Sequence, residues 1–373
     1  KVGDITVRAP SVDVRTIGAG GGSIAFVPEL TRALRVGPDS AGADPGPAAY
    51  MKGGDKATVC DANVVLGYLP SDVKLGGAMN INREAATAAV QTLADAMDID
   101  LMAAAEGIIK IVNESMLGAL RLVSVEQGYD PRDFALVGFG GAGPLHANAL
   151  GVLSGSWPVI VPPGPGVLCA YGDATTQIQD EASRTYVTSV DSISAEDLVA
   201  ELEGLRARAS QSFITDGISE EQHEVSYQAD FRYAGQAFQL SLPVTIEQLR
   251  SEGLSVLTDE FDRQHEQLFT FALGMDHEIV MIRAVVKAES SLSADLSRVS
   301  KGATDVKAAA IHDTKVYVDQ KWHDAVVYDR SKLGVDAVVL GPAIVVEMDS
   351  TTLILADHAA TVDKVGNLLI NPV

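Results

Sequence analysis

The stretch VGFGGAGPLHA, residues 137–147, limits what this chain can fold into more than any other part of the sequence. Gly140, Gly141 and Gly143 allow backbone conformations that are closed to residues with a Cβ atom, and they let a ligand approach the main chain closely. Pro144 follows at a position where the first turn of a helix tolerates proline. The stretch therefore predicts a buried strand, a tight glycine turn and the start of a helix.

This arrangement is a common way to hold a nucleotide, because it presents free backbone N–H groups and the positive end of a helix dipole. A tight strand-to-helix turn without a ligand has the same sequence features, since a glycine-rich loop alone is a weak signal. Both interpretations stay open on this stretch alone. His146, in the first turn of the expected helix, is a weak candidate for catalysis, and a packed, hydrogen-bonded histidine is the alternative.

A second glycine cluster, GAGGGS, occupies residues 18–23. Four glycines in five residues are more than a hairpin turn needs, which favours a functional loop over a simple hairpin. We expect its backbone amides to lie near phosphate groups or substrate. The residues concerned are Gly20, Gly21, Gly22 and Ser23.

Residues 34–54 form a long stretch rich in Gly, Pro, Ser and Asp without hydrophobic periodicity. A stretch of this length is either disordered or a specific functional loop. Its apolar neighbours and the turn expected at residues 61–63 favour an ordered loop. Asp39, Asp44, Asp55 and Asp61 are candidates for holding Mg²⁺ or a water molecule, and Asp61 is a weak candidate for catalysis. An aspartate that caps a turn through its own backbone is the alternative for each.

Periodicity predicts the remaining elements. Residues 1–17 alternate in the manner of a strand, residues 158–161 complete a parallel β-α-β unit, and residues 290–304 are expected to be an exposed linker. Short strands separated by turns are expected over residues 314–370. The predicted helices span residues 84–97, 101–126, 195–214 and 246–271, and further strands span 225–233, 237–242 and 278–287.

Composition narrows the classes of partner. The formal net charge of −22 argues against nucleic acid and anionic membranes as partners, because the long-range field would repel both. No run of 18 apolar residues occurs. Cys60 and Cys169 both have apolar neighbours, which predicts buried free thiols and fits a cytoplasmic protein. The opening KVGDITVRAP lacks Met, from which we expect a processed or incomplete polypeptide.

Several familiar catalytic patterns are missing from the sequence. The seven histidines are scattered, with no HxH or HExxH pattern, so no metal site is predicted. The segment GGGSIA lacks the G-x-S-x-G spacing of a nucleophilic serine, and the lysine of a P-loop is absent. The two glycine loops and the long Gly/Pro stretch remain as the candidate functional features.

These segments, in this order, resemble the hydantoinase A/oxoprolinase family of ATP-dependent lactamases and related carboxylases. The resemblance covers nearly the whole chain in collinear order. The matching stretches are residues 16–25, 34–50, 58–69, 128–147, 161–172, 231–240 and 341–353. Two small departures are Cys60, where the family usually has Thr, and Cys169, where it usually has Ser.

The resemblance implies an α/β fold. Residues 1–177 would form part of the second lobe of an actin-like ATPase core, the fold shared with sugar kinases. Residues 178–373 would form a C-terminal α+β domain that ends in a β-rich cap. In such a core, ATP with Mg²⁺ lies between two lobes. The resemblance assigns adenosine to Gly140, Gly141, Ala142 and Gly143, phosphates or substrate to the loop at residues 18–23, and weaker polar anchoring to Asp44 and Asp61.

One large departure concerns the partners. The family carries an N-terminal lobe with a glycine/threonine phosphate turn, and a second Asp-Gly-Gly-Thr turn before residue 16, and neither is in this sequence. The resemblance therefore implies either that a separate or cleaved polypeptide supplies the missing lobe or that the chain was truncated, and that this chain alone does not hydrolyse ATP. It also implies a hydantoinase B-like subunit, in which a further metal could reside.

The implied reaction is ATP-dependent opening of a hydantoin, lactam or oxoproline ring through a phosphorylated substrate. Phosphorylation turns a poor electrophile into one with a good leaving group, and the protein's task is mainly positioning and charge stabilisation. A subunit of an ATP-dependent ketone carboxylase of the acetone or acetophenone type is one alternative. A structural subunit without catalytic function is another.

Overall fold

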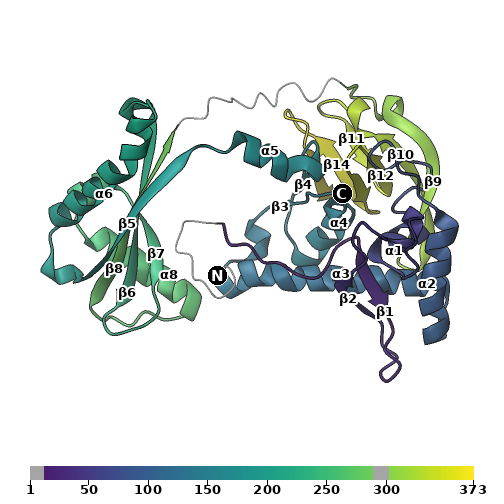
Figure 1. The fold of residues 1–373 in the computed structure, drawn as a ribbon, viewed down its shortest axis with the longest axis horizontal. Helices are drawn as coiled ribbons and strands as arrows, with labels where there is room; N and C mark the ends of the chain where they lie inside the picture. The colour runs from purple at the N-terminus through teal and green to yellow at the C-terminus, as the bar shows by residue number, and fades with distance from the viewer. Residues whose placement is uncertain (1–11, 289–301) are drawn as a thin grey trace. The chain divides into compact units, whose positions relative to one another are not determined.

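The computed structural model describes residues 12–288 and 302–373, which belong to two compact units. The first unit combines residues 1–171 with residues 295–373, and the second spans residues 172–294. Figure 1 shows the yellow C-terminal strands beside the helices of the first unit. The β-rich tail therefore packs with the N-terminal half of the chain, whereas the expected C-terminal domain combined it with residues 178–294.

Helices α1, α2 and α3 of the first unit each begin at a side-chain cap. Thr58 and Asp61 form a reciprocal capping box, and Asn82 and Asp100 accept hydrogen bonds from backbone N–H groups of the helices that follow them. The helices of this unit are α1 (Val59–Val65), α2 (Arg83–Met97), α3 (Leu101–Val123), α4 (Gly143–Ser154) and α5 (Leu168–Thr175), which runs past the unit boundary.

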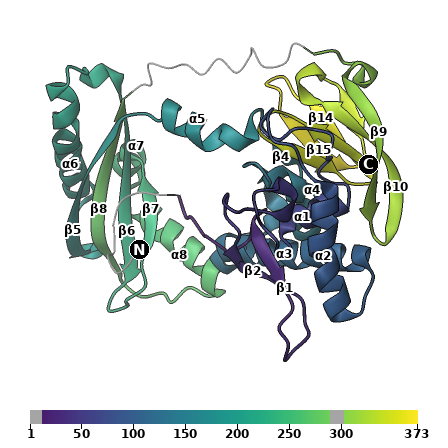
Figure 2. The same ribbon diagram turned by 45° about the vertical axis from the view of Figure 1, so that its right-hand side comes forward.

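A five-stranded sheet carries the predicted β-α-β unit. Its order is β11 (Val338–Leu340), β14 (His358–Val362), β15 (Leu368–Pro372), β4 (Val159–Val161) and β3 (Leu136–Val137). Strands β3 and β4 are parallel and α4 connects them, which confirms the prediction. Both ribbon views show α4 beside these strands (Figures 1 and 2).

Two glycines allow α4 to pack this closely. A Cβ atom on Gly138 would lie 2.5 Å from the Cβ of Ala147, and one on Gly151 would lie 2.4 Å from a methyl group of Val159. No real Cβ atom tolerates such distances, so the glycines set the separation between helix and sheet.

The other strands of the first unit form two smaller sheets. One has the order β13 (Thr351–Ile354), β12 (Ala343–Val346), β10 (Lys321–Asp329) and β9 (Ala310–Val318). The other is the hairpin of β1 (Ser23–Phe26) and β2 (Arg35–Ser40). The main apolar core of the unit lies between helices α1, α2 and α3 and the inner faces of β9, β10, β12 and β13.

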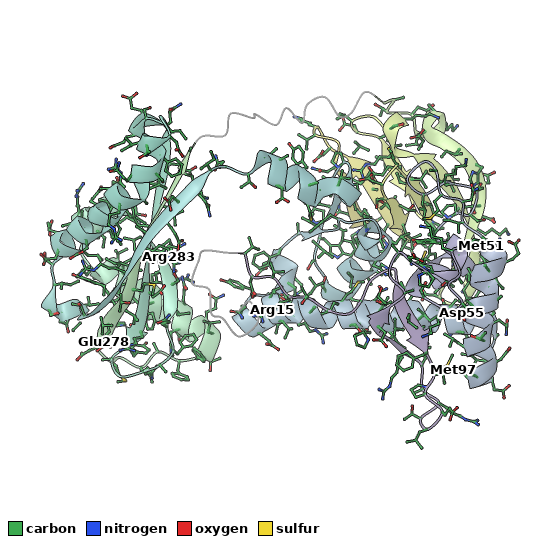
Figure 3. All side chains as sticks on the ribbon, viewed as in Figure 1. Arg15, Met51, Asp55, Met97, Glu278 and Arg283 are labelled. Atoms are coloured by element: carbon green, nitrogen blue, oxygen red, sulfur yellow. The ribbon has the colours of Figure 1, made fainter. Side chains whose placement is uncertain are left out.

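The second unit is a four-stranded antiparallel sheet with helices against it. Its strands follow the order β5 (Gln179–Ser189), β8 (His277–Ala288), β6 (His223–Tyr233) and β7 (Leu240–Val244). Two residues of β8, Glu278 and Arg283 (Figure 3), bind side chains of β6. Glu278 accepts a hydrogen bond from Arg232 at 2.8 Å, and Arg283 donates one to Gln228 at 3.1 Å. The helices are α6 (Ala195–Thr215), α7 (Ile246–Glu252) and α8 (Ser255–Phe269).

Four sequence expectations differ from the structure. The stretch 34–54 contains strand β2 and the 3-10 helix Ala48–Tyr50, because residues 35–40 pair with β1. Residues 61–63 lie within α1 and are not a turn. The helix expected over 246–271 is divided at Gly253, whose φ is 78°. Of the two cysteines, Cys60 is buried as expected but Cys169 is exposed on α5.

The expected strand over residues 1–17 is missing at residues 12–17, and residues 1–11 lie outside the described part. Most of the expected linker, residues 289–301, also lies outside it. Within the described residues, no helix is both long and apolar enough to cross a membrane. Short 3-10 helices complete the fold at Val125–Gln127, Pro131–Asp133, Pro165–Val167, Val190–Ser192, Glu220–Gln222, Val306–Ala309 and Arg330–Lys332.

Candidate functional site

The two glycine loops meet at one cavity of about 390 Å³ in the first unit. Gly21 of the first loop and Gly141 and Ala142 of the second line this cavity. A Cβ atom on Gly21 would lie only 3.5 Å from the Cβ of Ala142. Residues that are about 120 positions apart in the sequence therefore form one wall, which we call the glycine-loop cavity.

The second loop ends at a helix start that lacks a side-chain cap. Ala142 is the N-cap residue of α4, and no side chain accepts a hydrogen bond from the first turn. Gly140 has a φ of 86°, and its N–H donates to the Pro165 carbonyl at 2.7 Å. No heavy atom lies within 4 Å of a Cβ added to Gly140 or Gly143. The helix start thus combines open space with first-turn amides that no side chain satisfies, which is the local chemistry of an anion site.

Hydrogen bonds fix the first loop from both sides. The Ser23 hydroxyl accepts from the Gly20 N–H at 2.9 Å and donates to the Gly18 carbonyl at 3.3 Å. The Gly21 carbonyl accepts from the Cys60 N–H, and the Gly22 carbonyl accepts from the Ala41 N–H, both at 2.8 Å. The buried Ser23 side chain therefore holds the loop in shape. Of the loop residues predicted to contact a ligand, Gly21 lines the cavity.

The turn between β12 and β13, residues 347–350, also lines the cavity, a role that was not predicted from the sequence. The Ser350 hydroxyl lies 3.3 Å from the Gly140 carbonyl and 3.1 Å from the Gly141 carbonyl, to which it donates. Asp349 lines the cavity, and its Oδ2 has no hydrogen-bond partner among the described residues. A polar Glu-Met-Asp-Ser tip between two fully buried strands is the signal that could have identified this turn.

A buried ion pair anchors the same turn. Glu347 accepts from the Arg330 guanidinium at 2.7 Å and from the Gly164 N–H at 3.1 Å. Arg330 also donates to the carbonyls of Val161 and Gly366, at 2.7 and 3.0 Å. Burial lowers the pKa of Arg330 and raises the pKa of Glu347, and the opposite charge of each partner counteracts both shifts. The pair thereby joins the turn to the segment that accepts the Gly140 N–H.

Asp61 is next to the cavity wall in sequence but its carboxylate is fully occupied. It accepts from the N–H groups of Ala48, Ala49 and Thr58 and from the Thr58 hydroxyl, at 3.4, 2.8, 2.9 and 2.7 Å. Burial raises the pKa of this carboxyl, and the four donors oppose the rise. Asp61 is fully buried, so the arrangement is that of a structural capping residue. Asp44 is exposed and does not line the cavity.

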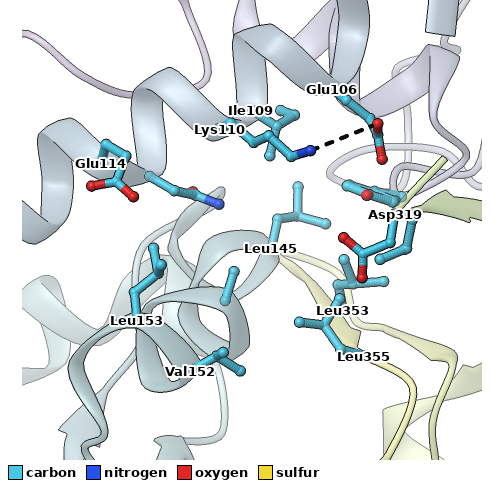
Figure 4. Close-up of a pocket in the computed structure, with 14 residues that line it drawn as sticks. Glu106, Ile109, Lys110, Glu114, Leu145, Val152, Leu153, Asp319, Leu353 and Leu355 are labelled. Carbon is cyan, nitrogen blue, oxygen red and sulfur yellow. Dashed lines mark ion pairs between the residues drawn. The ribbon is translucent and has the colours of Figure 1, made fainter. Parts of the chain in front are cut away.

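His146 belongs to a different environment. It is buried, and its Nδ1 lies 2.8 Å from Asn113 Oδ1, so Nδ1 carries the proton. Burial lowers the pKa of His146 to about 4, which leaves the ring neutral near pH 7. Asn113 lines a second pocket of about 250 Å³ between α3, α4 and residues 353–355 (Figure 4). Figure 4 shows Leu145, which lines both cavities, pointing into this pocket.

Neither a thiol nucleophile nor a dedicated metal centre is evident at the glycine-loop cavity. Burial raises the pKa of the Cys60 thiol to about 12, so it stays protonated. No group of three or more His, Cys, Asp or Glu side chains among the described residues could hold a metal ion. Asp349 is the carboxylate that lines the cavity. A Mg²⁺ ion that keeps several waters and binds mainly to phosphates requires no more than one or two such groups.

Comparison with known proteins places this geometry in a family. A model described as hydantoinase/oxoprolinase matches residues 1–182, and one described as hydantoinase/oxoprolinase C-terminal domain matches residues 188–369. The caprolactamase subunit alpha of Pseudomonas jessenii is 35% identical over 98% of this chain and 53% of its own length. The chain thus spans about half the length of the curated relatives it matches.

Solved structures agree with this assignment. A crystal structure of the ATP-dependent caprolactamase from Pseudomonas jessenii superposes with a TM-score of 0.85 and 33% identity, covering 96% of this chain and 53% of that chain. A nucleotide-free structure of acetone carboxylase gives 0.71 and 24%, over 95% of this chain and 52% of that chain, which shows the fold alone. The expected α/β fold of the actin-like ATPase type is confirmed. The chain belongs to the hydantoinase/oxoprolinase family.

Proposed function

We propose that this chain is the nucleotide-binding component of an ATP-dependent amidohydrolase that opens a cyclic amide through a phosphorylated substrate. The observation that carries the proposal is the meeting of two glycine loops at one cavity, beside a helix start without a side-chain cap. Backbone amides at such a helix start favour anions, and glycines let phosphates or a nucleoside approach the main chain.

In this proposal the chain acts by binding and positioning. Gly140, Gly141, Ala142 and Gly143 hold the adenosine side of ATP, and Gly20, Gly21 and Gly22 lie towards the phosphates or substrate. Bound ATP supplies the phosphoryl group that activates the amide oxygen. Asp349 is the carboxylate in the cavity lining, and in this proposal it approaches Mg²⁺ on the phosphates. Oriented amides that require no reorganisation are an effective way to stabilise developing negative charge.

Amide hydrolysis has more support than ketone carboxylation. The caprolactamase subunit matches at 35% identity and its structure at a TM-score of 0.85. A carboxylase subunit and a structural subunit remain the alternatives that the tests below separate from this proposal.

The proposed partners follow from the length of this chain relative to the length of its relatives. Because the chain spans about half of its relatives, we propose that a second polypeptide segment provides the other ATPase lobe with its phosphate turns. We also propose a hydantoinase B-like subunit as the place where the activated substrate is hydrolysed. The chain alone would then bind nucleotide weakly and would not turn it over.

Gly141→Val tests the nucleotide site directly. A Cβ atom at Gly141 would meet its nearest neighbour, the Asp349 carbonyl, at an ordinary 3.7 Å, and the φ of Gly141 is not positive. The substitution should therefore leave the fold intact while it fills the cavity. We expect the assembled enzyme to lose ATP affinity by at least roughly tenfold, about 1.4 kcal/mol, in isothermal titration calorimetry.

Gly118→Val is the matched control for this experiment. Gly118 is exposed on α3, and a Cβ atom there meets no heavy atom within 4 Å. Valine is also a better helix former than glycine, so folding should not suffer. We expect ATP affinity equal to that of the unmodified enzyme. Absence of ATP binding by the unmodified assembled enzyme would favour the structural-subunit alternative and end the proposal.

A further inference from the structure

Asn63 is a buried amide without a hydrogen-bond partner on the wall of the glycine-loop cavity. Its side chain is 1% exposed, and both Nδ2 and Oδ1 lack a partner among the described residues. Its backbone is fully engaged, because its carbonyl accepts from the N–H groups of Tyr68 and Leu69 at 2.9 and 3.1 Å. The side chain alone is left with one acceptor and two donors.

Such an amide is costly to bury unless something satisfies it. An unpaired buried donor or acceptor costs about 1–3 kcal/mol, and Asn63 presents both kinds. Helix α1 does not need an asparagine here for its own structure, since its cap is made by Thr58 and Asp61. The apolar residues around it on α1, Ala62 and Val64, are fully buried. A buried amide in this setting needs a partner that the chain does not supply, which is either a ligand or an ordered water.

The surroundings of Asn63 describe the shape of that partner. Leu69, Leu75 and Met79 give the cavity apolar walls, which suit the faces of a ring. Two neighbouring polar groups are engaged: the Ser350 hydroxyl binds the second glycine loop, and the Cys60 thiol is in hydrogen-bond contact with Tyr50. The unpartnered Asp349 Oδ2 is a carboxylate oxygen, which accepts hydrogen bonds but donates none. Asn63 is therefore the lining amide that is free to read the edge of a ligand.

We infer that Asn63 is a specificity-determining residue of the glycine-loop cavity, where its amide pairs with a ring whose edge offers a hydrogen-bond donor beside an acceptor. This inference rests on the proposed function, because it assigns a contact within the same site. A purine base with its amino group and a cyclic amide both offer this edge. The asparagine amide matches it with two parallel hydrogen bonds, as it does when it reads adenine.

Asn63→Leu separates binding from folding. Leucine has a similar volume and removes both unpaired groups, so the free energy of unfolding of the ligand-free protein should stay equal or rise. Ligand affinity of the assembled enzyme should fall by roughly 10- to 100-fold, as expected for two lost hydrogen bonds. A purely structural asparagine would give the opposite pattern, with lower stability and unchanged affinity.

Two pairs of compounds show whether the ring is a purine base or a cyclic amide. In each pair, the second compound lacks the hydrogen-bond donor of the first. ATP is compared with purine riboside triphosphate, which has no amino group, and 2-piperidone is compared with N-methyl-2-piperidone. If the cavity reads a purine, Asn63→Leu abolishes the preference for ATP within the first pair. If it reads a cyclic amide, the substitution abolishes the preference within the second pair.

Thr352→Val is the matched control. The Thr352 hydroxyl is also buried without a partner among the described residues, but Thr352 does not line the cavity. The substitution should leave all four affinities unchanged.

Unchanged affinities in Asn63→Leu, where the unmodified enzyme binds ATP, would overturn the inference alone and point to an ordered water on Asn63. An enzyme that binds no ATP but discriminates the lactams through Asn63 would overturn the proposed function alone, and failure to bind any probe would overturn both.

Discussion

His146 shows how burial changes the meaning of a residue that is attractive in sequence. It follows the glycine turn in the chain, yet its ring contacts Asn113 and lies away from the lining of the glycine-loop cavity. A neutral, buried imidazole that donates its Nδ1 proton to Asn113 fits the packing alternative, although its Nε2 has no partner among the described residues. Its titration should therefore appear in the stability of the protein and not in ligand binding.

The expected pH dependence follows from the pKa of His146. Burial holds this pKa at about 4, against about 6.5 in an unfolded chain. Between these values the unfolded state binds more protons, so the free energy of unfolding falls as the pH drops from about 7 to about 4. The loss attributable to His146 is on the order of 3 kcal/mol. Below pH 4 the contribution is gone, and above pH 6.5 it is fully present.

Denaturant unfolding at several pH values tests this expectation with His146→Gln. Glutamine can still donate to Asn113 but binds no proton in this range. The difference in stability between the unmodified protein and the variant should shrink as the pH falls. A difference that stays constant from pH 7 to pH 4 would show that the imidazole titrates normally in the folded protein.

Asp61 is a second residue whose role could be anticipated only in part. Its alternative as a capping aspartate was visible from the sequence, because Thr58 precedes it by three positions. The two further donors, Ala48 and Ala49, come from the 3-10 helix at residues 48–50, which composition alone did not predict. Sequence patterns describe residues that are close along the chain. They therefore do not show that donors from distant residues occupy a carboxylate.

At the scale of elements, the turn at residues 347–350 depends on the buried pair Arg330–Glu347. Glu347→Gln leaves the Arg330 guanidinium buried without its counter-charge. We expect a loss of roughly 3–5 kcal/mol in the free energy of unfolding, the range measured when one partner of a buried pair is removed. Urea unfolding followed by circular dichroism measures it, and a loss below about 1 kcal/mol would contradict the anchoring role.

The double variant Arg330→Met with Glu347→Leu is the control for this prediction. Replacing both charges by apolar groups of similar size should recover most of the lost stability. ATP affinity should be lower than in the unmodified enzyme, because the Gly164 N–H no longer has its acceptor and the turn is no longer joined to the segment that accepts the Gly140 N–H. Full recovery of both properties would mean that the pair affects the site only through folding.

Elements with strong local signals were predictable, and elements defined by distant partners were not. Helices α2 and α6 were predicted nearly to the residue, because periodicity and caps coincide. Strand β2 was missed, since its sequence RVGPDS carries turn residues and only pairing with β1 makes it extended. Ser350 of the 347–350 turn contacts Gly140, which is 210 positions away in the second glycine loop, and no local pattern encodes such a contact.

At the scale of the whole molecule, the exposed edge of strand β3 in the first unit is a candidate contact surface. The chain spans about half the length of its relatives, so we expect a further segment to cover this edge. Strand β3 ends its sheet and pairs with β4 on one side among the described strands. Val137 and Phe139 are 47% and 46% exposed, and Val14 is 73% exposed beside them along a groove of about 480 Å³. Adjacent exposed apolar residues at an unpaired strand edge are typical of a surface that another segment covers.

Val137→Lys should disrupt assembly with the segment that we propose as the other ATPase lobe. A lysine on an edge strand opposes the addition of a further strand and leaves the isolated unit folded, because the side chain already faces solvent. Size-exclusion chromatography of this chain mixed with the other half should show a weakened complex, and ATP affinity of the mixture should fall with it. Leu30→Lys, at a residue 95% exposed outside the groove, should change neither. If both variants assemble equally well, the edge of β3 is not the contact, and the nucleotide cleft is completed from another side of the glycine-loop cavity.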